Sequence, residues 1–223
     1  MDVGDAKAVN SINAALSTDS GNNTNWTFYD YLYWILTSGT GNWSQPGNWS
    51  FSSGGNAGTT IPTASFPVIF DGNGKGNCLI DTDAQALSLE VKDGYSGTIN
   101  LNGETLKISS DLVVSGGTID GTAANSQLNI GGNLNISSGT INVSNTNVDL
   151  EKDFGLSGGG FTAPGPAKSF NIAGDFIITG GTFKHNDGTI IFDSTQFNRT
   201  LTTNNTPLYD VAVSYTHLTL PTN

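Results

Sequence analysis

One pattern of apolar residues recurs four times between Leu106 and Phe183, and it limits the possible folds more than any other feature of the chain. Each copy holds five apolar residues at an unchanged spacing, with a polar turn ending in Asp or Asn between the second and the third. Successive copies begin 22, 20 and 22 residues apart. The five positions are Leu106, Ile108, Leu112, Val114 and Ile119; Leu128, Ile130, Leu134, Ile136 and Ile141; Val148, Leu150, Phe154, Leu156 and Phe161; and Phe170, Ile172, Phe176, Ile178 and Phe183.

A nearly constant period of this length predicts an array of stacked repeats. Each copy contains three short strand-like segments, and the corners between them are rich in Gly, Asn and Ser, which suit tight turns. Glycine supplies 29 of the 223 residues and charged residues only 12%, a composition that is poor for helices. The sequence therefore predicts an all-β fold, a right-handed parallel β-helix (β-solenoid) with coils of about 20–22 residues and equivalent side chains in columns.

The phrase Gly-Thr-Ile recurs in several coils, and one copy departs from it. The phrase occurs at residues 97–99, 117–119 and 139–141, and Gly-Thr-Phe takes its place at residues 181–183. In the third copy, Gly160 stands where the other copies carry Thr. The third copy is therefore irregular at this position.

Residues 1–40 do not fit the repeat, and we predict that they hold a short helix followed by an aromatic leader. Over residues 5–17, Val9, Ile12 and Leu16 recur on one face at helical spacing. A helix of about three turns is marginal in water, so it would need to dock on another part of the protein.

Residues 41–66 are predicted to form a Trp-rich cap loop at the N-terminal end of the array. The phrase Gly-Asn-Trp-Ser occurs twice in it, with Trp43 and Trp49 as its tryptophans. One interpretation is a hydrophobic plug that closes the open end of the solenoid. The other is a glycan platform on which Trp43 and Trp49 stack against sugars. The plug is the more common use of large aromatic residues.

The solenoid itself is predicted to cover residues 67–213, with its clearest coils at 106–183 and an incomplete C-terminal end. Residues 214–223 fit no position of the repeat. They resemble a peptide that ends unrelated sequences through read-through of a sequencing adaptor. We therefore expect residues 214–223 to be a non-native tail and the natural protein to be longer.

Four side chains in a Gly-rich stretch form a candidate calcium site: Asp71, Asn73, Asp81 and Asp83. Alternating Asp and Asn residues resemble the start of a calcium-binding loop. Lys75 occupies a ligand position of such a loop, which favours an ordinary Gly-rich turn. Asp81 and Asp83 lie on the same side of an extended chain, so they could hold a cation, act as acid and base, or cap a strand in solvent. Beyond possible calcium binding, the sequence predicts no cofactor.

The other polar candidates have simpler interpretations. His185 is the only histidine before residue 214, and with no second His beside it we expect an exposed turn residue rather than a metal ligand. Four residues recur at one corner of successive coils, and because Asn interrupts the acids we interpret them as turn residues that bond their own backbone. These corner residues are Asp111, Asn133, Asp153 and Asp175.

Charge and hydropathy exclude two classes of partner. The formal net charge is -11 and Arg199 is the only arginine, so the chain lacks the basic cluster that nucleic acid requires. No apolar run is long enough to cross a membrane, and residues 1–20 show no secretory signal, so we expect neither membrane insertion nor a visible leader. Cys78 is the only cysteine, which excludes an intrachain disulfide, and we expect it to act as a small core residue.

Two sets of motifs resemble known proteins. The coils from Leu106 to Phe183 look like the right-handed parallel β-helix repeats of large bacterial adhesins and autotransporter passengers. The Trp-rich phrases, together with residues 68–71 and 94–99, are similar to repetitive surface or phage-associated proteins. The resemblance covers about residues 40–213. It implies an extracellular or cell-surface location, with cell-surface glycans or a host surface as partners.

From this resemblance we expect a non-catalytic structural or adhesive segment of a larger secreted or surface-displayed protein. One alternative is a polysaccharide-degrading or tailspike-like protein on the same pectin-lyase-like fold. Pectin-degrading relatives carry Asp-Asp pairs, Gly-His-Gly and basic residues on one face, and this sequence lacks them, which argues against an enzyme. The other alternative is a carbohydrate-binding module that uses Trp43 and Trp49.

Overall fold

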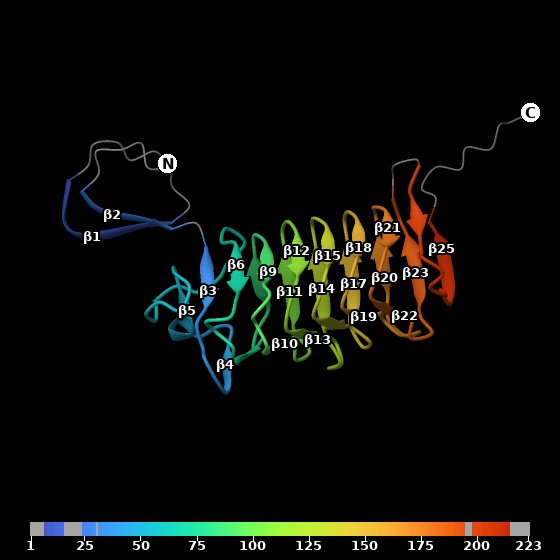
Figure 1. Ribbon diagram of the computed structural model, residues 1–223, viewed down its shortest axis with the longest axis horizontal. Coiled ribbons are helices and arrows are strands. Elements are labelled where there is room, and N and C mark those ends of the chain that lie inside the picture. Colours follow the sequence, from blue (N-terminus) through green and yellow to red (C-terminus); the bar gives the residue numbers. More distant parts are fainter. Residues whose placement is uncertain (1–6, 16–23, 30, 195–197, 215–223) are drawn as a thin grey trace, which may run out of the picture.

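The computed structural model describes residues 7–15, 24–29, 31–194 and 198–214 of the chain. From residue 32 onward the described residues form a parallel β-solenoid of about six turns, with coils of about 22 residues (Figure 1). Each complete coil gives one strand to each of three sheets, which run the length of the solenoid. The predicted fold class is therefore confirmed at the level of a parallel β-solenoid.

In each of the three sheets, the strands follow one another in space from the N-terminal end of the solenoid. The first sheet contains β5 (Trp49–Ser50), β3 (Leu32–Trp34), β6 (Val68–Phe70), β9 (Leu89–Val91), β12 (Leu112–Val114), β15 (Leu134–Ile136), β18 (Phe154–Leu156), β21 (Phe176–Ile178) and β24 (Leu201–Thr202). The second contains β4 (Thr40–Asn42), β7 (Asn77–Leu79), β10 (Thr98–Asn100), β13 (Thr118–Asp120), β16 (Thr140–Asn142), β19 (Gly160–Thr162) and β22 (Thr182–Lys184). The third contains β8 (Ala84–Ala86), β11 (Thr105–Ile108), β14 (Gln127–Ile130), β17 (Asn147–Leu150), β20 (Phe170–Ile172), β23 (Thr189–Phe192) and β25 (Asp210–Val213).

Neighbouring coils pair in register, so the apolar residues of the repeat stack in columns. Leu106 pairs with Leu128, Leu128 with Val148, and Val148 with Phe170, all in parallel strands. Every apolar position of the four copies is buried, and the most accessible of them, Phe183, is only 7% exposed. The polar residues between these positions point outward because successive side chains of a strand alternate between its two faces.

The size of the core residues changes along the solenoid. In the early coils the small residues Cys78, Ala84 and Ala86 line the interior. They leave room for a cluster of large aromatic rings, which includes Trp34, Trp43, Trp49, Phe70 and Tyr95. In the later coils phenylalanines stack on their equivalents in the next coil, as in Phe154 on Phe176 with ring centroids 4.7 Å apart. Cys78 is fully buried, as expected for a small core residue, and burial raises the pKa of its thiol.

The corner between the third and first sheets is held by a ladder of side-chain acceptors that runs from coil to coil. Asp111 accepts a hydrogen bond from the backbone N–H of Asn133 at 2.7 Å, and the Asn133 side-chain oxygen accepts one from the N–H of Asp153. Asp153 and Asp175 continue the ladder in the same way, and the last step ends at the N–H of Thr200. These residues therefore bond the backbone of the next coil, whereas the sequence had suggested bonds to their own backbone.

The corner between the first and second sheets requires glycine. Gly139 has a φ of +69°, in the left-handed region that residues with a side chain rarely adopt. A Cβ atom at Gly139 would also lie 2.4 Å from the carbonyl oxygen of Gly116 in the preceding coil. The close stacking of the coils and the turn conformation thus both explain the repeated Gly at this corner.

The N-terminal helix predicted over residues 5–17 is wrong for the described part of that segment. Residues 7–15 form a strand, β1 (Lys7–Ala15), which pairs in parallel with β2 (Thr24–Tyr29). A helix of this length is marginal by itself, whereas a paired strand satisfies backbone groups and suits β-branched Val and Ile. The remaining residues of the predicted helix lie outside the described residues.

The two ends of the described solenoid differ. At the N-terminal end, β3 and β4 pair in parallel with β6 and β7, and β5 pairs antiparallel with β3 after a short 3-10 turn, η1 (Pro46–Asn48). At the other end, the last coil leaves four large apolar side chains exposed: Leu201, Tyr209, Val211 and Val213. Ser214 donates its N–H to the carbonyl of Phe192, and the rest of the predicted tail lies outside the described residues.

Candidate functional site

Trp43 and Trp49, the predicted glycan platform, are buried inside the first coil. Trp43 is 2% exposed and Trp49 is 0% exposed. Their rings meet edge to face with centroids 4.8 Å apart, and the Trp49 indole N–H donates to the backbone carbonyl of Trp43. Phe70 packs against both rings, and Trp34 packs against Trp49. Both rings are thus packed in the core of this structure. The stacking of Trp43 and Trp49 against sugars stays a prediction.

Asp71 and Asn73, the first half of the predicted calcium site, are bonded to each other and to the cap loop. One carboxylate oxygen of Asp71 accepts the backbone N–H of Asn73 at 2.9 Å, and the other accepts the hydroxyl of Ser53. The Asn73 side-chain amide donates to the same Ser53 hydroxyl at 2.8 Å. These hydrogen bonds close the turn at Asp71 and Asn73 and hold it against the cap loop.

Asp81 and Asp83, the second half, are bonded in two different directions. Asp81 accepts both the N–H and the hydroxyl of Ser44, whereas Asp83 accepts the N–H of Thr105 in the next coil. Burial tends to raise the pKa of the Asp81 carboxyl, but hydrogen bonds, the strongest of them from Ser44, together outweigh it and lower that pKa below its usual value. Within the described residues, no group of three or more His, Cys, Asp or Glu side chains is placed to hold a metal ion. The four side chains predicted as calcium ligands therefore hydrogen-bond to turns, to the cap loop and to the next coil.

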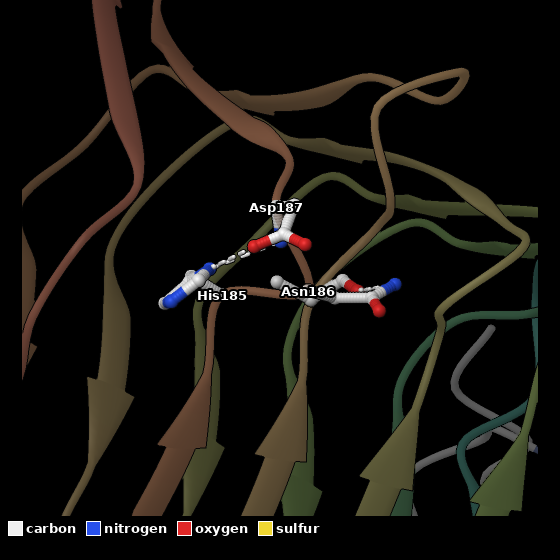
Figure 2. A network of polar contacts seen from close by, with 4 residues as sticks. His185, Asn186 and Asp187 are labelled. Carbon is white, nitrogen blue, oxygen red and sulfur yellow. Dashed lines mark hydrogen bonds and ion pairs between the residues drawn. The ribbon is translucent and has the colours of Figure 1, made fainter.

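His185 lies in the turn between β22 and β23, where Asn186 and Asp187 both have positive φ (Figure 2). The Nδ1 atom of His185 accepts the backbone N–H of Asp187 at 3.0 Å and also lies 3.4 Å from the Asp187 carboxylate. An Nδ1 atom that accepts a hydrogen bond carries no proton, so the bond from the Asp187 N–H belongs to the neutral His185 ring. The ion pair with the Asp187 carboxylate would require the protonated ring. The Asn186 amide donates to the carbonyl of Ala163 in the preceding coil at 3.2 Å. Turn formation and coil stacking account for these polar contacts.

Asp149 and Asp193 are two acids on the outer face of the third sheet, two coils apart, that the sequence analysis did not single out. Asp149 pairs with Asn171 in the next coil, Asn171 pairs with Ile191, and Asp193 follows two residues later. Burial, and then the negative charge of Asp149, raise the pKa of the Asp193 carboxyl. A carboxyl with a raised pKa is one element of glycoside hydrolysis, which also requires a second carboxyl close to it. The two acids are far apart in the sequence, so only the register of the coils shows that they share a face.

The outer face of the second sheet carries an in-register column of threonines. Thr98, Thr118 and Thr140 pair with one another in successive coils, and Thr182 continues the column after Gly160. In the part of the chain that the structure describes, these four hydroxyls make no hydrogen bond to the protein, unlike the Asp and Asn side chains at the corners. The column therefore presents hydroxyl groups to the exterior at a one-coil spacing, which is about 4.8 Å between paired strands.

Gly160 interrupts this column, and a hollow of 520 Å³ lies over it. Thr140 and Thr182 flank the hollow along the column, while Thr162 and Lys184 line it from the neighbouring outward positions. A smaller hollow of 210 Å³ lies on the outer face of the first sheet, over Gly155. The sequence signal for the larger hollow was the missing Thr of the third copy.

No helix in the described residues is both long enough and apolar enough to cross a membrane. Comparisons of the chain with profiles of protein families, with curated proteins and with solved structures found no match.

Proposed function

We propose that this chain is a non-catalytic structural and adhesive segment of a larger secreted or surface-displayed protein. The proposal includes the kinship that its motifs suggest, with bacterial adhesins, autotransporter passengers or phage-associated surface proteins. The observation that carries it is the ladder from Asp111 to Thr200, in which corner side chains bond the backbone of the next coil. Because these side chains join each coil to the next, they stabilise the stacked coils as an extended rod.

A rod of stacked coils is suited to display because its surface is long, regular and rigid. Solenoids commonly bind partners through such extended faces. Here the second sheet offers one, because the outward threonines make no hydrogen bond to the described protein. Cell-surface glycans, which carry many hydroxyl groups, are the partners that this face would match.

The experiment tests whether the protein binds to polysaccharides or cells without degrading the polysaccharides. The purified protein is incubated with insoluble polysaccharides and with intact microbial cells, and the bound fraction is measured after sedimentation. In parallel, the supernatant of soluble polysaccharide mixtures is assayed for new reducing ends and for unsaturated sugar products. We expect retention on at least one surface and no new ends in any mixture.

A polysaccharide-degrading protein is the competing function, and the outward-facing acids Asp149 and Asp193 of the third sheet are the residues that it would use. New reducing ends that disappear in the variant Asp193→Asn would overturn the non-catalytic proposal. The variant Asp93→Asn serves as the control, because Asp93 is an exposed acid with no hydrogen bond in the described structure.

A further inference from the structure

Gly160 is a glycine that the backbone does not require. Its φ lies outside the left-handed region, unlike that of its neighbour Gly159, which is +68°. A Cβ atom at Gly160 would meet nothing closer than the Thr140 side chain at 3.8 Å, an ordinary contact distance. Glycine weakens the interior of a strand, and Thr is among the residues that strands favour. The fold would therefore accept the Thr that other coils have here, and what Gly160 changes in this coil is the space that it leaves open.

That space has the chemistry of a polar binding subsite. The side chains of Thr140, Thr162 and Thr182 offer hydroxyls that donate and accept, and Lys184 offers an ammonium group that donates. Each threonine also carries a methyl group, so the walls combine apolar and hydrogen-bonding surface. No carboxylate lines the hollow, although the chain as a whole carries a net charge of -11.

We propose that the hollow over Gly160 binds one sugar residue of a neutral glycan that lies along the outer face of the second sheet. A sugar ring presents hydroxyls at its rim and C–H groups on its faces, which matches the threonines on both counts. The ligand is neutral because the acidic chain repels a polyanion over its whole length and a single Lys184 cannot offset that. This inference rests on the adhesive function proposed above and assigns that function to a site.

The decisive variant is Gly160→Thr, which fills the hollow with the residue that the other coils carry. Binding to cello-oligosaccharides, mannan, chitin oligosaccharides and, as the anionic comparison, polygalacturonate is measured by titration calorimetry for the parent and the variant. For the glycan that the parent binds, we expect Gly160→Thr to raise the Kd roughly tenfold or more, because the ring loses its place and its hydrogen bonds. Thermal unfolding of the variant should match or exceed that of the parent, which shows that the loss is local.

Two further variants make the test independent of Gly160. Lys184→Ala and Thr182→Ala each remove a side chain of the hollow and should weaken the same glycan. Thr98→Ala removes an equivalent hydroxyl in a coil away from the hollow and should leave its affinity unchanged. Equal weakening by all three would assign binding to the whole column and overturn the subsite.

The remaining outcomes separate this inference from the adhesive function. If the parent and Gly160→Thr bind the glycan equally, the subsite is overturned and the adhesive function stands. If only polygalacturonate binds, the assignment to a neutral glycan is overturned. If the parent binds no polysaccharide and no cell surface, both proposals fall together.

Discussion

Asp111 shows how a single side chain joins two coils. Its Oδ1 atom accepts the backbone N–H of Asn133 at 2.7 Å and also faces the Asn133 side-chain amide at 3.3 Å. The backbone N–H at this corner has turned away from the strand ladders, so a carboxylate supplies the acceptor that it needs. The recurrence of Asp and Asn at the corner could be predicted from the sequence. The partner could not, because an acceptor at a turn can serve its own backbone or the next coil.

We expect Asp111→Ala to destabilise the solenoid by about 1–3 kcal/mol, because it leaves a partly buried N–H without an acceptor. The measurement is the free energy of unfolding in denaturant. Asp93→Ala, which removes an exposed acid with no hydrogen bond in the described structure, is the control and should change the free energy little. Equal effects of the two substitutions would show that the ladder contributes nothing measurable.

The Ser44–Asp81 contact gives a prediction for pH. The folded state lowers the pKa of the Asp81 carboxyl, so the contact stabilises the protein above the carboxyl's ordinary pKa and is lost as pH falls through the folded-state value. Ser44→Ala should therefore cost more stability at about pH 7 than at about pH 3, by at most about 1 kcal/mol because solvent screens this carboxyl. Unfolding curves at both pH values check this, and a cost that does not vary with pH would contradict it.

At the scale of the element, the strand β15 shows which part of the fold the sequence could predict. Leu134 and Ile136 point into the core, at 0% and 1% exposure, while Asn135 between them is exposed. This alternation within the strand, repeated at a constant period, was enough to place every apolar column. Local spacing alone misled at β1, where Val9 and Ile12 also fit one face of a helix and only the pairing with β2 decides the structure.

Ile136→Asp should abolish the cooperative unfolding transition or cost about 4 kcal/mol or more, because it places an unpaired charge between two coils. Asn135→Asp introduces the same carboxylate at the neighbouring outward position and should leave the transition nearly unchanged. Thermal unfolding followed by circular dichroism compares the two. A normal transition in Ile136→Asp would contradict the stacked core.

At the scale of the molecule, the two ends of the solenoid differ in how well their apolar side chains are buried. The Trp-rich end is closed by buried rings, while the last described coil exposes apolar side chains such as Val211 and Val213. The sequence left Trp43 and Trp49 with two interpretations, a core plug and a glycan platform, because their burial depends on how the cap loop folds back on β3. The Gly160 hollow, by contrast, was already visible as a break in a repeat, although only the structure shows that a side chain would fit there.

The direction of the bonds between coils has a mechanical consequence. Hydrogen bonds between strands run along the long axis, whereas the covalent chain winds around it, and β3 and β25 lie toward opposite ends (Figure 1). A force that pulls these ends apart acts on non-covalent contacts in series, so coils detach one after another. Each freed coil lengthens by roughly 70–80 Å as it straightens. Under tension the rod would therefore yield in steps and dissipate work before any covalent bond is strained.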